Sequence, residues 1–234
     1  MEIYSAISLS LKSATIKDCM KTTNGLVRNK NVSRFIEHIR STVESSGIKF
    51  VLAPVKYLVL SSEGYIRCNG YFDSEELNLK CAINKPILEW LPILVHEYSH
   101  FEQWKENCPS WRHIEINGQD ISDDMFLWIG GKKVSNSRLR KIINKVRNCE
   151  LDCEKRAVRN IRKFKLPIDV HHYIQSSNAY IYFHEYIYLT RQWYKDGKAP
   201  YNIDKIVNEM PFRFLNRYDK LPKKYCILFD KYCT

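Results

Sequence analysis

The sequence predicts an α+β protein with a small antiparallel sheet in its first half and a mainly helical second half. Between residues 49 and 84, short apolar runs alternate with Gly and Asn turn signals, which is typical of strands. After residue 136, apolar residues recur at the three- and four-residue spacing of helices. With 234 residues, of which 44% are hydrophobic, the chain can bury one substantial core. We therefore expect a single domain over residues 1–234.

The spacing of apolar residues and the positions of Pro and Gly divide this domain into two parts, residues 1–105 and 106–234. In the first part we expect a helix over residues 31–47, followed by strands in KFVLAP, YLVLSS, GYIRCNGYFD and ELNLKCAIN. Pro92 suits the first turn of a helix, so a central helix should run from just before Ile93 to about Lys105. In the second part we expect an irregular segment with one short helix in ISDDMFLWI, then helices over 137–164 and 168–194.

Composition limits the location and the partners. No apolar run is long enough to cross a bilayer, and the N-terminus lacks the pattern of a secretory signal. We therefore expect a cytoplasmic protein with no membrane partner and reduced cysteines. Cys149 and Cys153 form C-x3-C, but no second pair at matching spacing supports a structural zinc site. The net charge of +11 is compatible with nucleic-acid binding, and solvated helix faces are the alternative explanation for the basic runs.

The segment ILVHEYSHFEQW contains HEYSH, an instance of the H-E-x-x-H pattern. On a helix, His96 and His100 lie on one face, so both imidazoles can bind a single ion. Glu97 is rotated away from the ion and can reach a water bound to it, which suits a general base. Two imidazoles and a carboxylate would leave the fourth position of Zn2+ open for that water. The alternative is a chance pair of core histidines, but burying His96, Glu97 and His100 together without a metal would be costly.

A third ligand has to come from the acidic residues after the motif. Those between residues 120 and 124 lie in an expected loop and are better explained as solvated turn residues. In NCELDCEKRAV, Glu150 and Glu154 share one helix face, and a cation opposite them would relieve their repulsion. Glu150 can then bind the metal while Glu154 orients one of the histidines, or the two roles can be exchanged. The alternative is an exposed acidic face paired with neighbouring Lys and Arg.

HEYSH followed by ELDCE resembles the gluzincin metallopeptidases, in which a glutamate on a later helix completes the zinc site. By this resemblance Glu150 binds zinc and Glu154 orients a histidine. This chain has Glu at 154 and Cys at 153 where the most similar members carry Asp and Ala. The order of motifs over residues 50–195 is also similar to small metallopeptidases encoded by bacteriophages, which would work in the cytoplasm of the host cell. The resemblance implies a zincin-like fold and Zn2+ as cofactor.

Two further features concern the substrate. By the same resemblance, the strand over Asn78–Asn84 borders the cleft and pairs with an extended peptide, and an internal strand is the alternative. In the last long helix, Tyr180 and His184 lie four residues apart and can donate hydrogen bonds to the oxyanion of a tetrahedral intermediate. An aromatic core stripe is the alternative for this pair.

The sequence therefore predicts a zinc metallopeptidase, specifically a metalloendopeptidase, that acts on a protein or peptide substrate. In such an enzyme, replacing Glu97 by Gln would leave zinc bound but abolish cleavage. The competing prediction is a basic module that binds nucleic acid or protein and contains a purely structural zinc.

Overall fold

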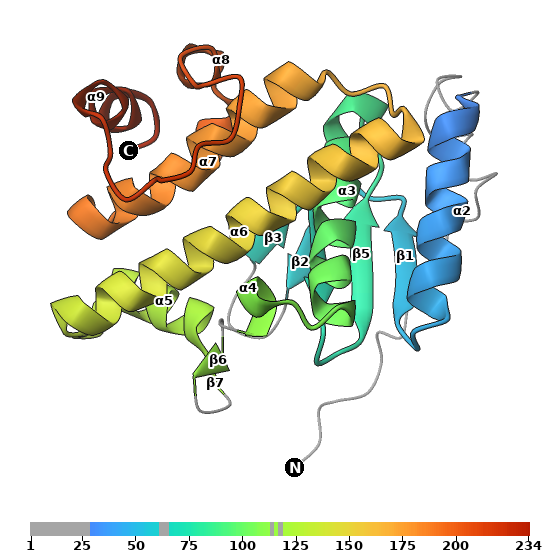
Figure 1. Ribbon diagram of the computed structural model, residues 1–234, viewed down its shortest axis with the longest axis horizontal. Coiled ribbons are helices and arrows are strands. Elements are labelled where there is room, and N and C mark those ends of the chain that lie inside the picture. The colour runs from blue at the N-terminus through green and yellow to red at the C-terminus, as the bar shows by residue number, and fades with distance from the viewer. Residues whose placement is uncertain (1–28, 61–65, 113–114, 117–118) are drawn as a thin grey trace. The chain divides into compact units, whose positions relative to one another are not determined.

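The computed structural model describes residues 29–60, 66–112, 115–116 and 119–234 (Figure 1). The chain divides into two compact units, Met1–Tyr98 and Ser99–Thr234. The boundary lies inside helix α3 (Ile87–Lys105), which is continuous across it. Across the described ranges, no helix combines the length and the apolar character that crossing a membrane requires.

The first unit contains a three-stranded mixed sheet with strand order β1-β5-β4. β5 pairs in parallel with β1 and antiparallel with β4, while β2 and β3 form a separate antiparallel pair. Helix α2 packs beside β1 (Figure 1). The elements before α3 are α2 (Lys30–Glu44), β1 (Lys49–Ala53), β2 (Leu58–Leu60), β3 (Ile66–Cys68), β4 (Gly70–Asp73) and β5 (Asn78–Ala82).

The α+β class is confirmed, but the sheet is mixed where a wholly antiparallel one was expected. Hairpin-like pairing of consecutive strands would have given antiparallel neighbours throughout. Instead β1 pairs with β5, and the connection between them is long enough for the crossover that parallel pairing requires. β5 is consequently the central strand of this sheet, with both edges occupied. The expectation that Asn78–Asn84 adds a peptide is therefore wrong, and the internal-strand alternative is right.

Helix α3 begins before Pro92 instead of at it. The carbonyl of Pro86 accepts hydrogen bonds from the backbone N–H groups of residues 89 and 90, which starts the helix one turn earlier than expected. Pro92 removes only the bond to the carbonyl of Leu88, and Leu88 is 62% exposed, so water can reach this turn. The rest of the helix buries apolar residues at three- and four-residue spacing, including Trp90, Leu94 and Phe101.

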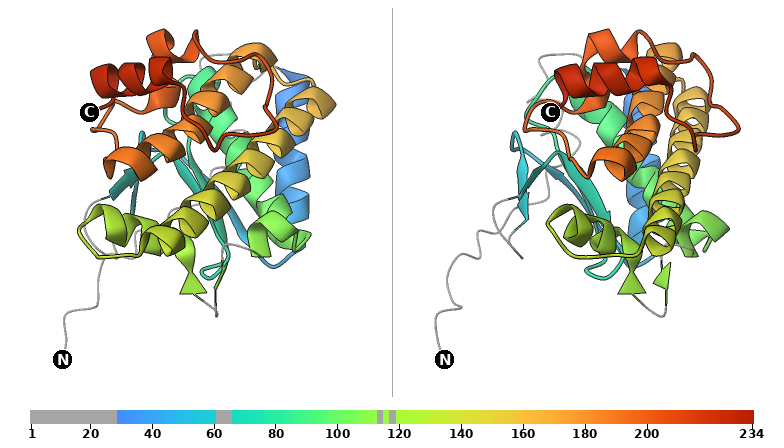
Figure 2. Two further views of the ribbon diagram at one scale, coloured as in Figure 1. Left: turned by 60° about the vertical axis from the view of Figure 1, so that its left-hand side comes forward. Right: turned by 90° about the vertical axis from the view of Figure 1, so that its left-hand side faces the viewer.

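The second unit is mainly helical, as expected, and its two long helices α6 and α7 run side by side (Figure 2). Ser135 and Asp169 cap their N-termini by accepting backbone N–H groups. α7 ends before the expected residue 194 because Arg191 adopts a left-handed conformation, with φ 58°. The elements after α3 are α4 (Pro109–Arg112), β6 (Glu115–Ile116), β7 (Gln119–Asp120), α5 (Ile121–Ile129), α6 (Asn136–Phe164), α7 (Val170–Thr190), η2 (Pro200–Asn202), α8 (Asp204–Val207) and α9 (Lys223–Tyr232).

A buried ion pair fixes the register of α6 against α7. Glu185 of α7 is 2% exposed and accepts hydrogen bonds from Arg147 and, at 2.6 Å, from Arg140, both on α6. A buried carboxylate without such partners would be strongly destabilising. Arg147 lies one turn before Glu150 on α6, and Glu185 follows His184 directly on α7. The ion pair between Arg147 and Glu185 therefore also fixes how far along the two helices Glu150 and His184 lie from each other.

Candidate metal centre

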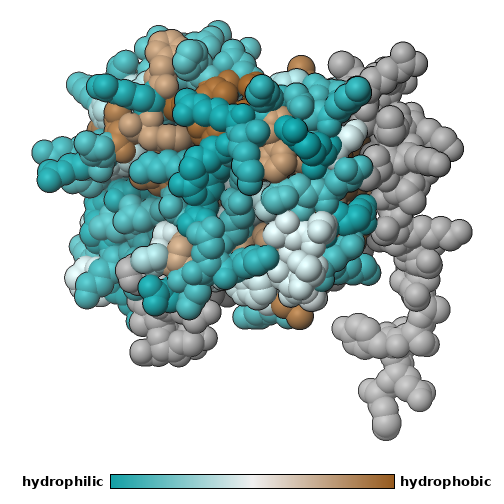
Figure 3. All heavy atoms as spheres, turned by 45° about the vertical axis from the view of Figure 1, so that its right-hand side comes forward, coloured by the Kyte–Doolittle hydropathy of each residue, from teal (hydrophilic) through white to brown (hydrophobic). Residues whose placement is uncertain are grey.

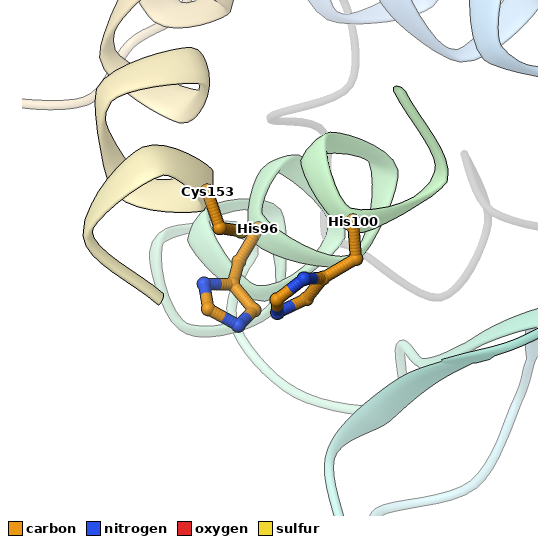
Figure 4. A group of neighbouring side chains, drawn as sticks. All are labelled: His96, His100 and Cys153. Atoms are coloured by element: carbon orange, nitrogen blue, oxygen red, sulfur yellow. The ribbon is translucent and has the colours of Figure 1, made fainter. Parts of the chain in front are cut away.

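Helix α3 presents two imidazoles on one face, one turn apart. Possible ligand atoms of His96, His100 and Cys153 all lie within 4.8 Å of one another. Figure 4 shows the two rings projecting to the same side of the helix, with Cys153 beside them. Because α3 is continuous, the position of His96 relative to His100 follows from the helix itself. Two imidazole nitrogens and a thiolate form a donor set that suits Zn2+.

Glu150, the predicted third ligand, lies next to this group. Its Oε2 is 3.6 Å from Nε2 of His100, and the two side chains are only 17% and 14% exposed. Glu150 is not one of the three residues whose ligand atoms fall within 4.8 Å of one another in the described part of the chain. Its role as a ligand therefore stays a prediction, with Cys153 as the competing donor.

Gln103 fixes the tautomer of His100. The amide nitrogen of Gln103 donates to the carbonyl of Cys149 and to Asp152, each at 2.9 Å. Its amide oxygen therefore faces Nδ1 of His100, at 2.8 Å, and can only accept. Nδ1 must then carry a proton in either charge state of the ring, so that in the neutral ring the lone pair belongs to Nε2, which faces the side where Glu150 lies. Metal-binding histidines are commonly oriented in this way by a hydrogen bond to the other ring nitrogen.

Asp152 in turn holds the Gln103 amide that orients His100. Its carboxylate accepts from Arg156 at 2.8 Å and from Ser110 at 3.1 Å, in addition to Gln103. Burial opposes ionisation of Asp152, but the hydrogen bonds from Gln103 and Arg156 outweigh it and lower its pKa. The Asp152 carboxylate accepts from the Gln103 amide and so holds it in the orientation that faces its oxygen to His100.

Replacing Gln103 by Leu is expected to lower the zinc affinity about 10- to 100-fold, the usual cost of losing a residue that orients a ligand. The side chain is fully buried, so its loss leaves Nδ1 of His100 without an acceptor. Competition with a chromophoric chelator at fixed pH measures the affinity. Gln192→Leu, at an exposed position, is the control. If a folded Gln103→Leu protein kept the wild-type affinity, the tautomer would be set by another group.

The surroundings of His100 favour a positive charge. Burial disfavours protonation, but the charges of Cys153 and Glu150 and hydrogen bonds with the thiols of Cys149 and Cys153 more than offset it. The pKa of His100 is consequently raised well above its ordinary value. A divalent cation at Nε2 would satisfy the same surroundings and would compete with that proton. The residues present therefore fit a bound cation.

Glu97 is placed against the sheet of the first unit. A Cβ atom at Gly70 of β4 would lie 3.1 Å from Cγ of Glu97 and 2.8 Å from Cγ2 of Ile93. Only glycine allows the strand to pass the helix this closely. Burial, and after it the charge of Glu97, raises the pKa of the Cys68 thiol in β3 to about 11. Glu97 is thus directed towards β3 and β4, one position along the helix from His96.

Glu154, predicted to orient a histidine, is buried and accepts a hydrogen bond from the hydroxyl of Ser177 at 2.9 Å. This bond leaves its second oxygen able to accept from another group, and the orienting role stays a prediction.

His184 cannot serve as the oxyanion donor that its position suggested. Its Nδ1 lies 3.0 Å from the carbonyl of Tyr180, which can only accept, so the ring proton is used there. Burial lowers the pKa of His184, so the ring is neutral and Nε2 is an acceptor. That atom is fully buried and has no hydrogen-bond partner among the described residues. The prediction for His184 is corrected accordingly.

Tyr180 keeps the proton that a hydrogen-bond donor needs. Burial, and after it the charge of Glu150, raises the pKa of its phenol well above the ordinary value, so the hydroxyl keeps its proton. Its ring packs edge-on against His184, with ring centroids 4.8 Å apart. The donor role of Tyr180 stays a prediction.

The acidic residues between 120 and 124 contribute no ligand that the structure describes. Asp124 lies in helix α5, not in a loop, and pairs with Lys132 and Arg138. The side chains of Asp120 and Asp123 lie outside the described residues.

Sequence reasoning missed Gln103, and it considered Cys153 as a metal ligand only as part of a C-x3-C pair and not together with the two histidines. Cys153 follows Glu150 by three residues on one helix, so the spacing that selected Glu150 also placed a thiol on the same face. Gln103 stands at the same three-residue distance after His100, where a side chain on α3 can reach the ring. No protein family, curated protein or solved structure matches this chain.

Proposed function

We propose that this protein is a zinc-dependent metallopeptidase. The observation that carries the proposal is the state of His100, whose Nδ1–H is held by Gln103 while Nε2 is directed towards Glu150. Gln103, Asp152 and Arg156 support this ring in the way that residues behind metal-binding histidines commonly do. His96, His100 and Cys153 would hold the ion, and Glu150 is the alternative third ligand.

Glu97 is the proposed general base. Zinc, when bound, would polarise the peptide carbonyl and lower the pKa of a coordinated water towards neutrality. Glu97 follows His96 directly, so it can take the proton from the attacking water and pass it to the leaving amine. The hydroxyl of Tyr180 would donate a hydrogen bond to the negative charge that develops on the carbonyl oxygen.

The proposed substrate is an extended peptide alongside β4. β4 has β5 as its strand neighbour in the described sheet, so its other edge can pair with a peptide backbone. The close approach at Gly70 brings this strand within van der Waals reach of Glu97. A peptide paired with β4 would therefore run near the proposed base.

A structural zinc is the second candidate, and the presence of Cys153 in the group favours it. If Cys153 and Glu150 both bound the ion together with the two histidines, all four tetrahedral positions would be filled, as in structural sites. No position would then remain for water.

The test of the proposed function combines metal analysis with digestion of a peptide library. Protein purified without chelator is expected to contain about one equivalent of zinc and to cleave peptides, and a chelator should remove both zinc and activity. Restoring zinc should restore cleavage. Zinc-loaded protein that cleaves no member of a broad library would contradict the enzyme and support the structural site.

A further inference from the structure

Helix α6 carries basic residues along the face opposite Glu150 and Cys153. Counting along this face in steps of three and four, six of the eight positions are Lys or Arg, and the two in the middle are Asn148 and Asp152. Five of the six basic residues are exposed and Lys145 is partly buried. We call them the basic stripe: Arg138, Lys141, Lys145, Lys155, Arg159 and Arg162. At a rise of about 1.5 Å per residue, the stripe is about 36 Å long.

Most residues of the stripe form no salt bridge among the described residues. Arg138 pairs with Asp124, but the other five members have no ion pair with any residue that the structure describes. Like charges at this spacing repel one another and destabilise the helix unless an anion lies opposite them. Residues 99–234 contain 25 of the 37 Lys and Arg residues and 16 of the 26 Asp and Glu residues, so this unit carries +9 of the net charge of +11. The charge is therefore concentrated in the unit that contains the stripe.

The chemistry of the stripe distinguishes between possible polyanions. Binding to single-stranded nucleic acid relies on aromatic side chains that stack on the bases, and the stripe has none. Binding of a helix to a membrane surface relies on an apolar face that enters the lipid, whereas the apolar face of α6 is buried in the protein. The face of the molecule drawn in Figure 3 is mostly hydrophilic, with hydrophobic residues in scattered patches.

The length of the stripe fits a nucleic-acid duplex. One turn of B-form DNA is about 34 Å long, close to the distance over which α6 presents its cations. The cations form two groups of three, 138–145 and 155–162, and both groups can contact phosphates without reading base edges. We propose that the basic stripe binds the phosphate backbone of double-stranded DNA, independently of base sequence. Asp152, which supports His100 through Gln103, lies between the two groups of the stripe. None of the six stripe residues is a proposed ligand, so this inference does not depend on the peptidase proposal.

Titration of a fluorescent duplex of mixed sequence, about three helical turns long, tests the proposal across a salt series. Five phosphate contacts predict that log K falls against log salt with a slope of about −4.5. The variant Lys155→Gln, Arg159→Gln, Arg162→Gln should reduce this slope by about 3 and weaken binding on the order of 100-fold near 0.1 M salt. Thermal unfolding of the variant checks that the exposed substitutions leave the fold intact.

The control variant Lys195→Gln, Lys198→Gln, Lys220→Gln removes the same charge from exposed positions outside α6. It should retain most of the wild-type affinity and slope. Equal losses in the two variants would overturn the proposal, because net charge alone would then explain binding. Tighter binding of single strands, of RNA duplexes or of vesicles rich in anionic lipid would also overturn it.

Discussion

Glu97→Gln protein is expected to bind zinc normally and to have lost peptide hydrolysis. The amide is almost the same size as the carboxylate but cannot accept a proton at neutral pH, and general-base catalysis is worth about 100- to 10,000-fold in rate. Glu97 is not a proposed ligand, so the metal content should not change. Hydrolysis of a peptide selected from the library measures activity, and elemental analysis measures zinc in the same sample.

The matched control for this prediction is Glu89→Gln. Glu89 is an exposed carboxylate in the first turn of the same helix, so this substitution makes the same change in charge and size. Its activity should equal that of the unchanged protein. A Glu97→Gln protein with full activity would exclude Glu97 as the base. Loss of zinc in Glu97→Gln would instead indicate that Glu97 supports the site structurally.

Local periodicity was enough to predict most helices. The long helix α6 lies within one residue of its expected start and ends at the expected residue, because both its apolar spacing and its Ser135 cap are encoded locally. The pairing of β1 with β5 is different, since it joins segments far apart in the sequence and depends on tertiary packing that no local pattern reports. The predicted start of α3 near Pro92 was wrong, because hydrogen bonds to the carbonyl of Pro86 start the helix earlier.

The metal centre also has a part that the sequence predicts and a part that depends on tertiary structure. His96, Glu97 and His100 are related by the geometry of one helix, so their spacing alone predicts their arrangement. Gln103 and Asp152 act together across two helices, and the sequence offers no spacing that connects them. The role of His184 depended on which ring nitrogen carries the proton. That is decided by a hydrogen bond to the carbonyl of Tyr180, which a residue pattern does not reveal.

The second large expected effect is the loss of zinc affinity when the third ligand is replaced. The ligand atom of Cys153 lies within 4.8 Å of those of both histidines, so we expect Cys153→Ser to weaken zinc binding by more than the roughly 100-fold cost of losing an orienting residue. With Co2+ in place of zinc, a thiolate ligand gives a charge-transfer absorption that serine cannot produce. This absorption should be present in the unchanged protein and absent in Cys153→Ser. Cys149→Ser, which removes the neighbouring buried thiol, should keep it.

Glu150→Gln is the second variant of this experiment. Comparing its zinc affinity with that of Cys153→Ser shows whether one or both of these side chains bind the ion. If Cys153 is the third ligand, Glu150→Gln should keep the charge-transfer absorption and most of the metal affinity, and the ion retains an open position for water. If the affinity collapses in Glu150→Gln and the unchanged protein shows no such absorption, Glu150 is the third ligand and the site is again open. If each substitution alone lowers the affinity by orders of magnitude, both side chains bind the ion together with the two histidines. The tetrahedral site is then closed, which argues for a structural zinc and against the peptidase.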